Sequence, residues 1–211
     1  MASENRAGPI RLIVTLGLAG FFSGLVIVSV FLATQPLIKR NQAEALEAAI
    51  YRVLPGAENR KIFVEQDGKL VEAQSADGAE AVFAGYDPGG KLIGYGIPSA
   101  GAGFQDTISL IYGYDPYKKQ IIGMQVLESR ETPGLGDKII KDQNFLDNFK
   151  ALVVVPEILS VATGTKANEN EVDSISGATI SSKAVVKILN TGNARWKKLI
   201  DEKTESEGQA G

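Results

Sequence analysis

The stretch GYDPGGKLIG at residues 85–94 returns as GYDPYKKQIIG at residues 113–123, 28 positions further along the chain. In each copy, Asp-Pro followed by Gly or Lys is typical of a tight turn, and apolar segments rich in β-branched and aromatic residues flank it. Each copy therefore predicts a strand, a turn and a second strand, and two successive hairpins favour an antiparallel sheet. The recurrence is either a duplicated hairpin or common turn chemistry, and the sequence leaves both open.

Around these hairpins the pattern predicts further strands and then helices. The predicted strands are Lys61–Glu65, Ala81–Tyr86, Lys91–Ile97, Thr107–Tyr114 and Gln120–Glu128. A short helix is predicted over Asn144–Val155, closed by Pro156, then a loop over Thr163–Glu171 and an amphipathic helix over Ser181–Glu202. Strands followed by helices indicate an α+β fold, and the polar residues 203–211 predict a disordered tail.

Upstream, residues 12–38 hold no charged side chain. A helix of this length is roughly 40 Å long and exceeds the ~30 Å hydrocarbon layer of a bilayer. We therefore expect a short tail (1–11), a transmembrane anchor (12–38), a stalk helix (39–56), a folded domain (57–202) and the tail (203–211). A buried core helix is the alternative for residues 12–38.

The charges that flank this span are nearly balanced, with Arg6 and Arg11 before it and Lys39 and Arg40 after it. Because a large following domain crosses a membrane regardless of local charge, we expect a cytoplasmic N-terminus and an external domain. The predicted location is the bacterial inner (cytoplasmic) membrane, single-pass, with the domain on the periplasmic side.

Between the span and Pro55-Gly56, apolar residues recur at helical spacing from Ala43 to Leu54. This amphipathic helix either contacts partner subunits or packs on its own domain, and the sequence does not decide between the two.

The residue types that are missing restrict the chemistry. The chain has no Cys and no His, which excludes disulfides, thiolate ligands, His-based triads and His-ligated haem or zinc. Residues 41–211 carry 18 Lys and Arg against 24 Asp and Glu, so we expect no nucleic-acid binding. Redox chemistry here requires a cofactor held by hydroxyls, backbone amides and apolar surfaces.

The chemically informative segment is DSISGATISS at residues 173–182, directly before the last predicted helix. Gly177 permits a tight turn, and Thr179 is then presented at a helix N-terminus, where free N–H groups and the helix dipole favour a phosphate. The hydroxyls of Ser176, Ser181 and Ser182 offer further donors. From the local chemistry alone, a serine that merely caps the helix is the favoured explanation.

Asp173, Ser176, Gly177, Ala178 and Thr179 form an Asp-x-x-Ser-Gly-Ala-Thr pattern that resembles the flavinylation motif of the FMN-binding domain family. Members include the G subunit of the Rnf electron-transport complex and the C subunit of the sodium-pumping NADH:quinone reductase. The resemblance implies that Thr179 carries FMN through a phosphoester, attached by a flavin transferase that uses FAD and magnesium. The residues that follow, from Ile180 to Val186, resemble the G subunit.

A second motif is Glu131-Thr132-Pro133-Gly134-Leu135-Gly136, in which Pro-Gly by itself predicts a type II turn. In the family this loop lies against the flavin. The resemblance implies that Thr132 and backbone amides contact the polar edge of the ring, with Leu135 against its apolar face. The chain has Ser129 where the family often has a His, so a proton-exchange role for that His is not expected here.

The resemblance covers nearly the whole chain and implies an electron-relay subunit of a ferredoxin:NAD-type ion-translocating complex. The implied partners are other membrane subunits and, during maturation, the flavin transferase. Two alternatives remain, which are the C subunit of the sodium-pumping reductase and an anchored sensor or scaffold without flavin.

Overall fold

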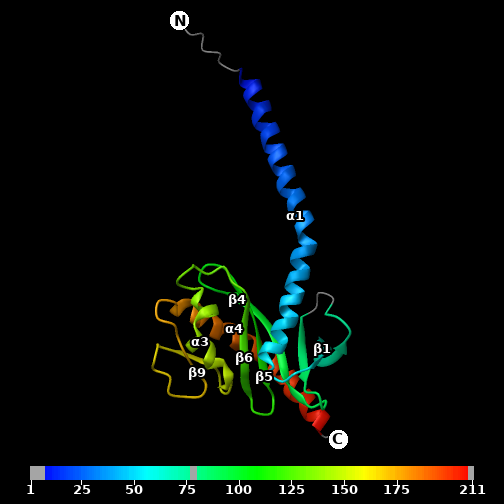
Figure 1. Cartoon of the computed structure of the whole chain (residues 1–211), viewed down its shortest axis with the longest axis vertical. Helices are drawn as coiled ribbons and strands as arrows, with labels where there is room; N and C mark the ends of the chain where they lie inside the picture. Colours follow the sequence, from blue (N-terminus) through cyan, green and yellow to red (C-terminus); the bar gives the residue numbers. More distant parts are fainter. Residues whose placement is uncertain (1–7, 77–79, 209–211) are drawn as a thin grey trace. The chain divides into compact units, whose positions relative to one another are not determined.

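A computed structural model describes residues 8–76 and 80–208, and the chain forms two compact units that meet between Glu44 and Ala45 in the sequence (Figure 1). The first long helix, α1, spans Pro9–Val53, and the last, α4, spans Thr179–Gly208. Between them lie β1 (Asn59–Gln66), β2 (Lys69–Ala73), β3 (Ala81–Tyr86), β4 (Leu92–Ala102), β5 (Thr107–Asp115), β6 (Gln120–Glu128), α2 (Lys138–Lys141), α3 (Gln143–Asp147), η1 (Asn148–Lys150), β7 (Leu152–Val153), β8 (Leu159–Val161) and β9 (Glu171–Asp173).

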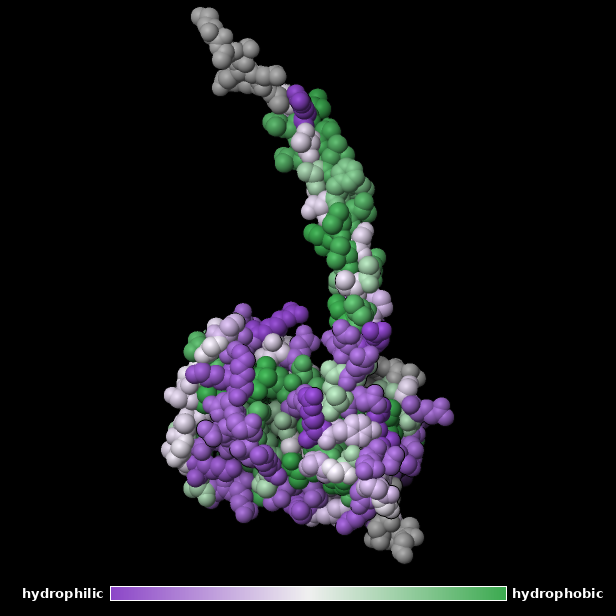
Figure 2. Space-filling view, in the orientation of Figure 1, coloured by the Kyte–Doolittle hydropathy of each residue, from purple (hydrophilic) through white to green (hydrophobic). Residues whose placement is uncertain are grey.

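The first unit contains the apolar part of α1. Within the described part of the chain, α1 is the one helix that is long and apolar enough to cross a membrane. None of its most apolar window is buried, and its large side chains, such as Phe21, Leu25 and Phe31, are exposed along the helix (Figure 2). A core helix of a soluble protein would bury these side chains, so the exposure favours the predicted anchor over that alternative. Of the predicted tail 1–11, residues 1–7 lie outside the described residues, and α1 already begins at Pro9.

The second unit is built on an antiparallel sheet, as predicted. Seven strands lie in the order β2-β1-β3-β4-β5-β6-β7, and every neighbouring pair is antiparallel. A separate parallel pair joins β8 to β9. The predicted strands Ala81–Tyr86 and Gln120–Glu128 match β3 and β6 residue for residue.

The two Gly-Tyr-Asp-Pro copies form the β3–β4 and β5–β6 turns. In the first, the Asp87 carboxylate accepts a bond from the N–H of Lys91 at 2.8 Å. In the second, Asp115 accepts from Tyr117 and Lys118 at 2.9 and 3.1 Å. The strand register also shifts at the same place in both copies, between the glycine and the tyrosine. The copies thus share the register shift and an aspartate that accepts from the turn, although the donors differ.

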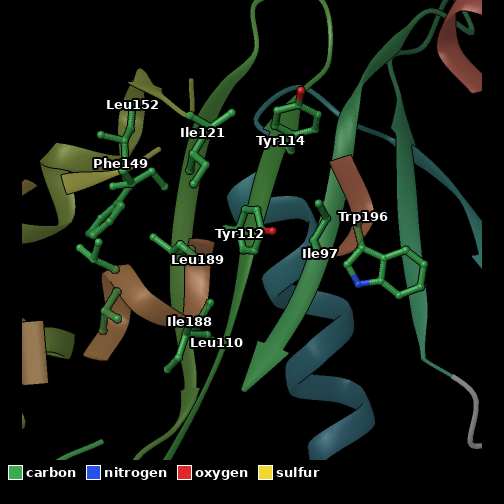
Figure 3. Close-up of a cluster of buried hydrophobic side chains, with 14 of the residues drawn as sticks. Ile97, Leu110, Tyr112, Tyr114, Ile121, Phe149, Leu152, Ile188, Leu189 and Trp196 are labelled. Atoms are coloured by element: carbon green, nitrogen blue, oxygen red, sulfur yellow. The ribbon is translucent and has the colours of Figure 1, made fainter. Parts of the chain in front are cut away.

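Helix α4 packs on one face of the sheet. Its Val185, Ile188, Leu189 and Trp196 join a core with inward side chains of β4 and β5, including Ile97, Leu110 and Tyr112 (Figure 3). Gly192 permits close contact between this helix and the sheet, although glycine has a low intrinsic helix propensity. A Cβ at this position would lie 2.5 Å from the Ser99 hydroxyl and 2.6 Å from the Tyr112 hydroxyl.

The C-terminal end of α1 packs on the opposite face, within the second unit. Its Ala49, Ile50 and Val53, with the following Leu54, are buried with Phe83 and Ile111 in a second cluster. The first and last glycines of each hairpin copy, Gly85, Gly94, Gly113 and Gly123, lie under Val53 and Leu54. A Cβ at Gly85 would be 2.7 Å from Leu54 Cδ1, and one at Gly123 would be 3.0 Å from Val53 Cα. The end of this helix therefore packs on its own domain, which is one of the two alternatives, and contact with partner subunits stays a prediction.

Three expectations were wrong. The helix predicted over Asn144–Val155 is replaced by the short helix α3, the 3-10 turn η1 and strand β7, since Asp142 caps α3 and the apolar residues after Lys150 pair with β6. The pattern also missed β2, β7, β8 and β9, which are short. Lys203–Gly208 continue α4 rather than forming a disordered tail, because Lys203 packs over the ring of Phe63 and Thr204 is buried. The rest of that tail, 209–211, lies outside the described residues.

Candidate functional site

A tight turn presents Thr179 at the start of α4. Gly177 has a φ of +79°, which L side chains rarely adopt, and the N–H of Ala178 bonds to the carbonyl of Ile175 at 3.0 Å. Thr179 is the first residue of α4, and it is exposed. The Thr179 hydroxyl has one internal contact, a long 3.5 Å hydrogen bond to the carbonyl of Ile175. The first N–H groups of a helix lack intrahelical partners, so this hydroxyl lies beside free donors.

The two serines that follow are used inside the protein. Ser182 is fully buried, where its hydroxyl donates to the carbonyl of Ala178 at 2.9 Å and accepts from the N–H of Ile175 at 3.1 Å. Ser181 is also buried, and it donates to a carboxylate oxygen of Glu131. In this structure both hydroxyls donate to protein oxygens, and their predicted contact with a phosphate stays a prediction. They fix the turn that presents Thr179.

Glu131 connects this turn to two other segments. One of its oxygens, Oε1, accepts from the N–H groups of Phe104 at 2.9 Å and Gln105 at 3.0 Å, in the β4–β5 loop. The other oxygen, Oε2, accepts from Ser181. Glycines permit this approach, since a Cβ at Gly136 would lie 2.6 Å from Oε2 and one at Gly103 would overlap Oε1. The carboxylate thus holds the β4–β5 loop, the loop after β6 and the start of α4 together.

The environment of Glu131 favours its charged form. Burial raises the pKa of this carboxyl, but bonds from the Ser181 hydroxyl and from backbone N–H groups of the β4–β5 loop lower it, and the net pKa is below its ordinary value. Glu131 is 5% exposed, so its charge is stabilised by these donors rather than by water.

The loop after β6 forms the predicted turn at Pro133-Gly134. Gly134 has a φ of +78°, and the N–H of Leu135 bonds to the carbonyl of Thr132 at 3.2 Å. The Thr132 hydroxyl donates to the Gln105 side chain at 2.9 Å, which adds a second link to the β4–β5 loop. Asp137 accepts from the N–H of Gly134 at 2.7 Å and fixes the far side of the turn.

Each of the three joined segments exposes one large apolar side chain. Phe104 is 63% exposed, Leu135 51% and Ile180 58%. Of these, only Leu135 was among the predicted site residues. Phe104 precedes the predicted strand Thr107–Tyr114 and has no motif around it. Its link to the site runs through its backbone N–H and Glu131, which no sequence signal could reveal.

The remaining motif residues have other positions. Asp173 accepts from the N–H groups of Thr165 and Lys166 at 3.1 and 3.0 Å, so its carboxylate closes the loop before β9. Ser176 is exposed immediately before Gly177. Among the described residues, no group of three or more acidic side chains is placed to hold a metal ion.

Residues 103–192, which include all three segments, match the FMN-binding domain family. The chain is 33% identical over 183 residues to the G subunit of the ion-translocating oxidoreductase complex of Methanosarcina acetivorans, an alignment that covers 86% of this chain and 90% of the relative. It is 28% identical to the G subunit of the proton-translocating ferredoxin:NAD(+) oxidoreductase complex of Clostridium ljungdahlii, over 79% and 80% of the two chains.

Solved structures share the fold. The C subunit of the Na(+)-translocating NADH-quinone reductase from Parabacteroides distasonis superposes with a TM-score of 0.62 at 23% identity, over 76% of this chain and 94% of that one. NqrC from Shewanella oneidensis gives a TM-score of 0.61 at 18% identity, over 76% and 99%. The identity of 33% to a G subunit, over 86% of this chain and 90% of that relative, shows the family. The chain belongs to the family of G subunits of ion-translocating oxidoreductase complexes.

Proposed function

We propose that this chain carries FMN on Thr179 through a phosphoester and relays electrons within a membrane ion-translocating oxidoreductase complex of the ferredoxin:NAD type. The observation that carries the proposal is the contrast between three neighbouring hydroxyls. Ser181 and Ser182 are buried and bonded to protein atoms, whereas Thr179 is exposed at the start of α4. Thr179 is also the residue that the flavinylation motif designates.

The residues around Thr179 fit a phosphate. The free N–H groups of the first turn of α4 and the positive end of its dipole lie at this hydroxyl, and such helix ends bind anions. Gly177 is exposed, and a Cβ placed there would lie 4.0 Å from both Leu135 Cδ2 and Lys138 Nζ. In maturation the Thr179 oxygen attacks the FMN-side phosphorus of FAD, and the new P–O bond replaces the bond to AMP. AMP leaves with that electron pair, and the hydroxyl proton is released.

The residues also fit a flat aromatic ring system. Phe104, Leu135 and Ile180 supply exposed apolar surface on the three segments that Glu131 joins, and burying such surface against a ring is favourable. On the same loop the Thr132 oxygen keeps the capacity to accept a hydrogen bond, while its own hydrogen is directed at Gln105. Glu131 would not contact the ring itself, since both of its oxygens accept hydrogen bonds from protein groups; it positions the segments that would contact the ring.

Bound FMN would supply the redox chemistry, accepting and giving electrons, while the protein positions it. An exposed attachment site suits a relay, because the redox partners must approach the ring. The partners in this proposal are other membrane subunits of the complex, with a flavin transferase acting during maturation. Helix α1 anchors the chain in the cytoplasmic membrane, with the flavin domain on its outer side.

The test uses the full chain made in a host that contains the flavin transferase. Intact-mass analysis and ultraviolet fluorescence on a denaturing gel should detect covalent flavin in the wild-type chain and in Thr132→Ala, but none in Thr179→Ala. Ser176→Ala is the matched control, since it removes the other exposed hydroxyl beside Gly177. Flavin that persists in Thr179→Ala and disappears in Ser176→Ala would show that the attachment is on a different residue from the one proposed.

Two alternatives make different predictions. An anchored sensor or scaffold predicts a wild-type chain without flavin mass. A C subunit of the sodium-pumping reductase predicts the same flavin but different partners, and the shared fold does not separate it from a G subunit. Sequence identity over 86% of the chain favours the G subunit, and co-purification with the remaining subunits from the native membrane would decide.

A further inference from the structure

Lys138, the first residue of α2, places its ammonium group beside the turn that presents Thr179. A Cβ built on Gly177 lies 4.0 Å from Lys138 Nζ. Lys138 follows the Glu-Thr-Pro-Gly-Leu-Gly motif by two residues, yet neither motif includes it, so no local pattern singles it out. The tertiary structure brings it to Gly177, 39 positions further along the chain.

The carboxylates near Lys138 have other partners. Asp137 accepts from Lys141 Nζ at 2.6 Å and from the N–H of Gly134 at 2.7 Å. Glu131 accepts from Ser181 and from two backbone N–H groups. The pKa of Asp137 is lowered mainly by its hydrogen bond from Lys141, and the charge of Lys138 adds to this effect. Across residues 8–76 and 80–208, Lys138 forms no ion pair. Its ammonium is therefore available to an anion.

The turn from Gly177 to Thr179 thus receives positive potential from two directions. One source is the N-terminus of α4, and the other is Lys138. In the unmodified chain these two sources repel each other slightly. A phosphodiester on Thr179 would carry one negative charge and would be attracted by both.

We propose that Lys138 is the counter-cation of the phosphodiester on Thr179, a positioning residue for the flavin that neither motif contains. This inference rests on the proposed function. Lys183, the next lysine after Thr179, has a different environment, because it lines a groove with Val155 and Lys187. Lys183→Gln is therefore the matched control for Lys138→Gln.

The experiment is a cycle of four full-length chains made beside the flavin transferase: wild type, Lys138→Gln, Thr179→Ala and the double variant. Intact mass first gives the flavinylated fraction of each. Thermal unfolding then gives the midpoint. In the flavinylated background, Lys138→Gln should lower the midpoint by about 2–4 °C, and added salt should shrink this loss. In the Thr179→Ala background the same change should leave the midpoint unchanged or raise it, because no anion faces Lys138.

The dependence on the modification is the informative result. If Lys138→Gln lowered the unfolding midpoint equally in both backgrounds, Lys138 would be a structural residue. If it lowered the midpoint in neither, Lys138 would lack the proposed role. Either result overturns this inference but leaves the proposed function standing. The inference would be supported by a lower flavinylated fraction in Lys138→Gln, together with a double variant that unfolds at the same midpoint as Thr179→Ala. A wild-type chain without flavin mass would instead overturn the proposed function, and this inference with it. Lys183→Gln should behave as wild type throughout.

Discussion

At the scale of single residues, Glu131 shows how one carboxylate organises the site. Its two oxygens receive three donors from two segments that are 26 to 50 positions away in the sequence. A carboxylate accepts hydrogen bonds at both oxygens. The amide of a glutamine has only one oxygen, so its NH2 group would face either the backbone N–H groups or the Ser181 hydroxyl, which are donors themselves. The family motif suggested a residue that lies against the flavin, whereas the geometry shows that Glu131 holds together the three segments that surround Thr179.

We expect Glu131→Gln to lower the free energy of unfolding by about 1–3 kcal/mol, because one buried donor loses its acceptor. The folded-state pKa of Glu131 lies below its ordinary 4.5, so its stabilising effect is complete above pH 4.5 and is lost as the pH falls through the folded pKa. The difference between wild type and variant should therefore be largest near neutral pH and should shrink in acid.

Denaturant titrations at several pH values would measure this difference. Glu128→Gln is the matched control, since Glu128 is on the surface and pairs with Arg130 at 3.6 Å, and it should change stability by less than about 1 kcal/mol. A difference for Glu131→Gln that stays constant from neutral pH into strong acid would contradict the assigned bonds.

At the scale of elements, glycine decides how closely the two helices approach the sheet. Gly101 and Gly192 lie at the contact between β4 and α4, where a Cβ on Gly101 would be 2.7 Å from Ile188 Cγ1. On the other face, Gly85 and Gly113 make room for Val53 and Leu54. Helix propensity alone favours alanine over glycine at position 192, but the close packing at this position favours glycine.

We expect Gly192→Ala to destabilise the folded domain by about 1–3 kcal/mol, although alanine is the better helix former by roughly 1 kcal/mol. The added methyl would meet the hydroxyls of Ser99 and Tyr112. The Tyr112 side chain is fully buried, and its hydroxyl donates to Asn193 Oδ1 at 3.1 Å. Thr191→Ala, on the exposed side of the same turn, should be neutral or slightly stabilising. Urea denaturation would compare them, and a Gly192→Ala domain as stable as wild type would refute the packing argument.

At the scale of the whole molecule, the unit that begins at Ala45 takes the end of α1 as part of its core. The boundary that matters for folding is therefore inside α1, and not at the Pro55-Gly56 turn where the stalk helix was predicted to end. Residues 45–54 belong to the folded domain because Ile50, Val53 and Leu54 are buried against the sheet.

Two truncations test this boundary. A chain that begins at Ala45 should fold and stay soluble without detergent, because it keeps both clusters and omits the apolar part of α1. A chain that begins at Glu58 should be much less stable, since Phe83 and Ile111 lose their cover and burial of several large side chains is worth about 1.5–3 kcal/mol each. Circular dichroism melting would compare the two, and equal midpoints would show that the end of α1 is dispensable.

Local sequence patterns were enough to predict the class of fold and the match to the FMN-binding domain family. Alternation and turn residues are local, so the five longest strands, both hairpins and the last helix could be predicted, and the uncharged run predicted the membrane helix. The motif at residues 173–179 indicated Thr179 as the attachment residue, because such a motif is defined by the identities of neighbouring residues alone. Short strands such as β2 and β9 carry too few residues for a periodic signal, and the helix predicted over 144–155 was wrong because pairing with β6 outweighs local preference.

Which side chains meet depends on the folded chain and could not be predicted. Nothing local tells that Glu131 bonds to Ser181, that Phe104 is held beside the same turn, or that Lys138 lies near Gly177. Folding also buries two of three similar hydroxyls and exposes the third, since burial depends on what packs over a segment. Contacts between distant parts of the chain arise from the packing of whole elements, and that information is spread over the sequence rather than carried by any one motif.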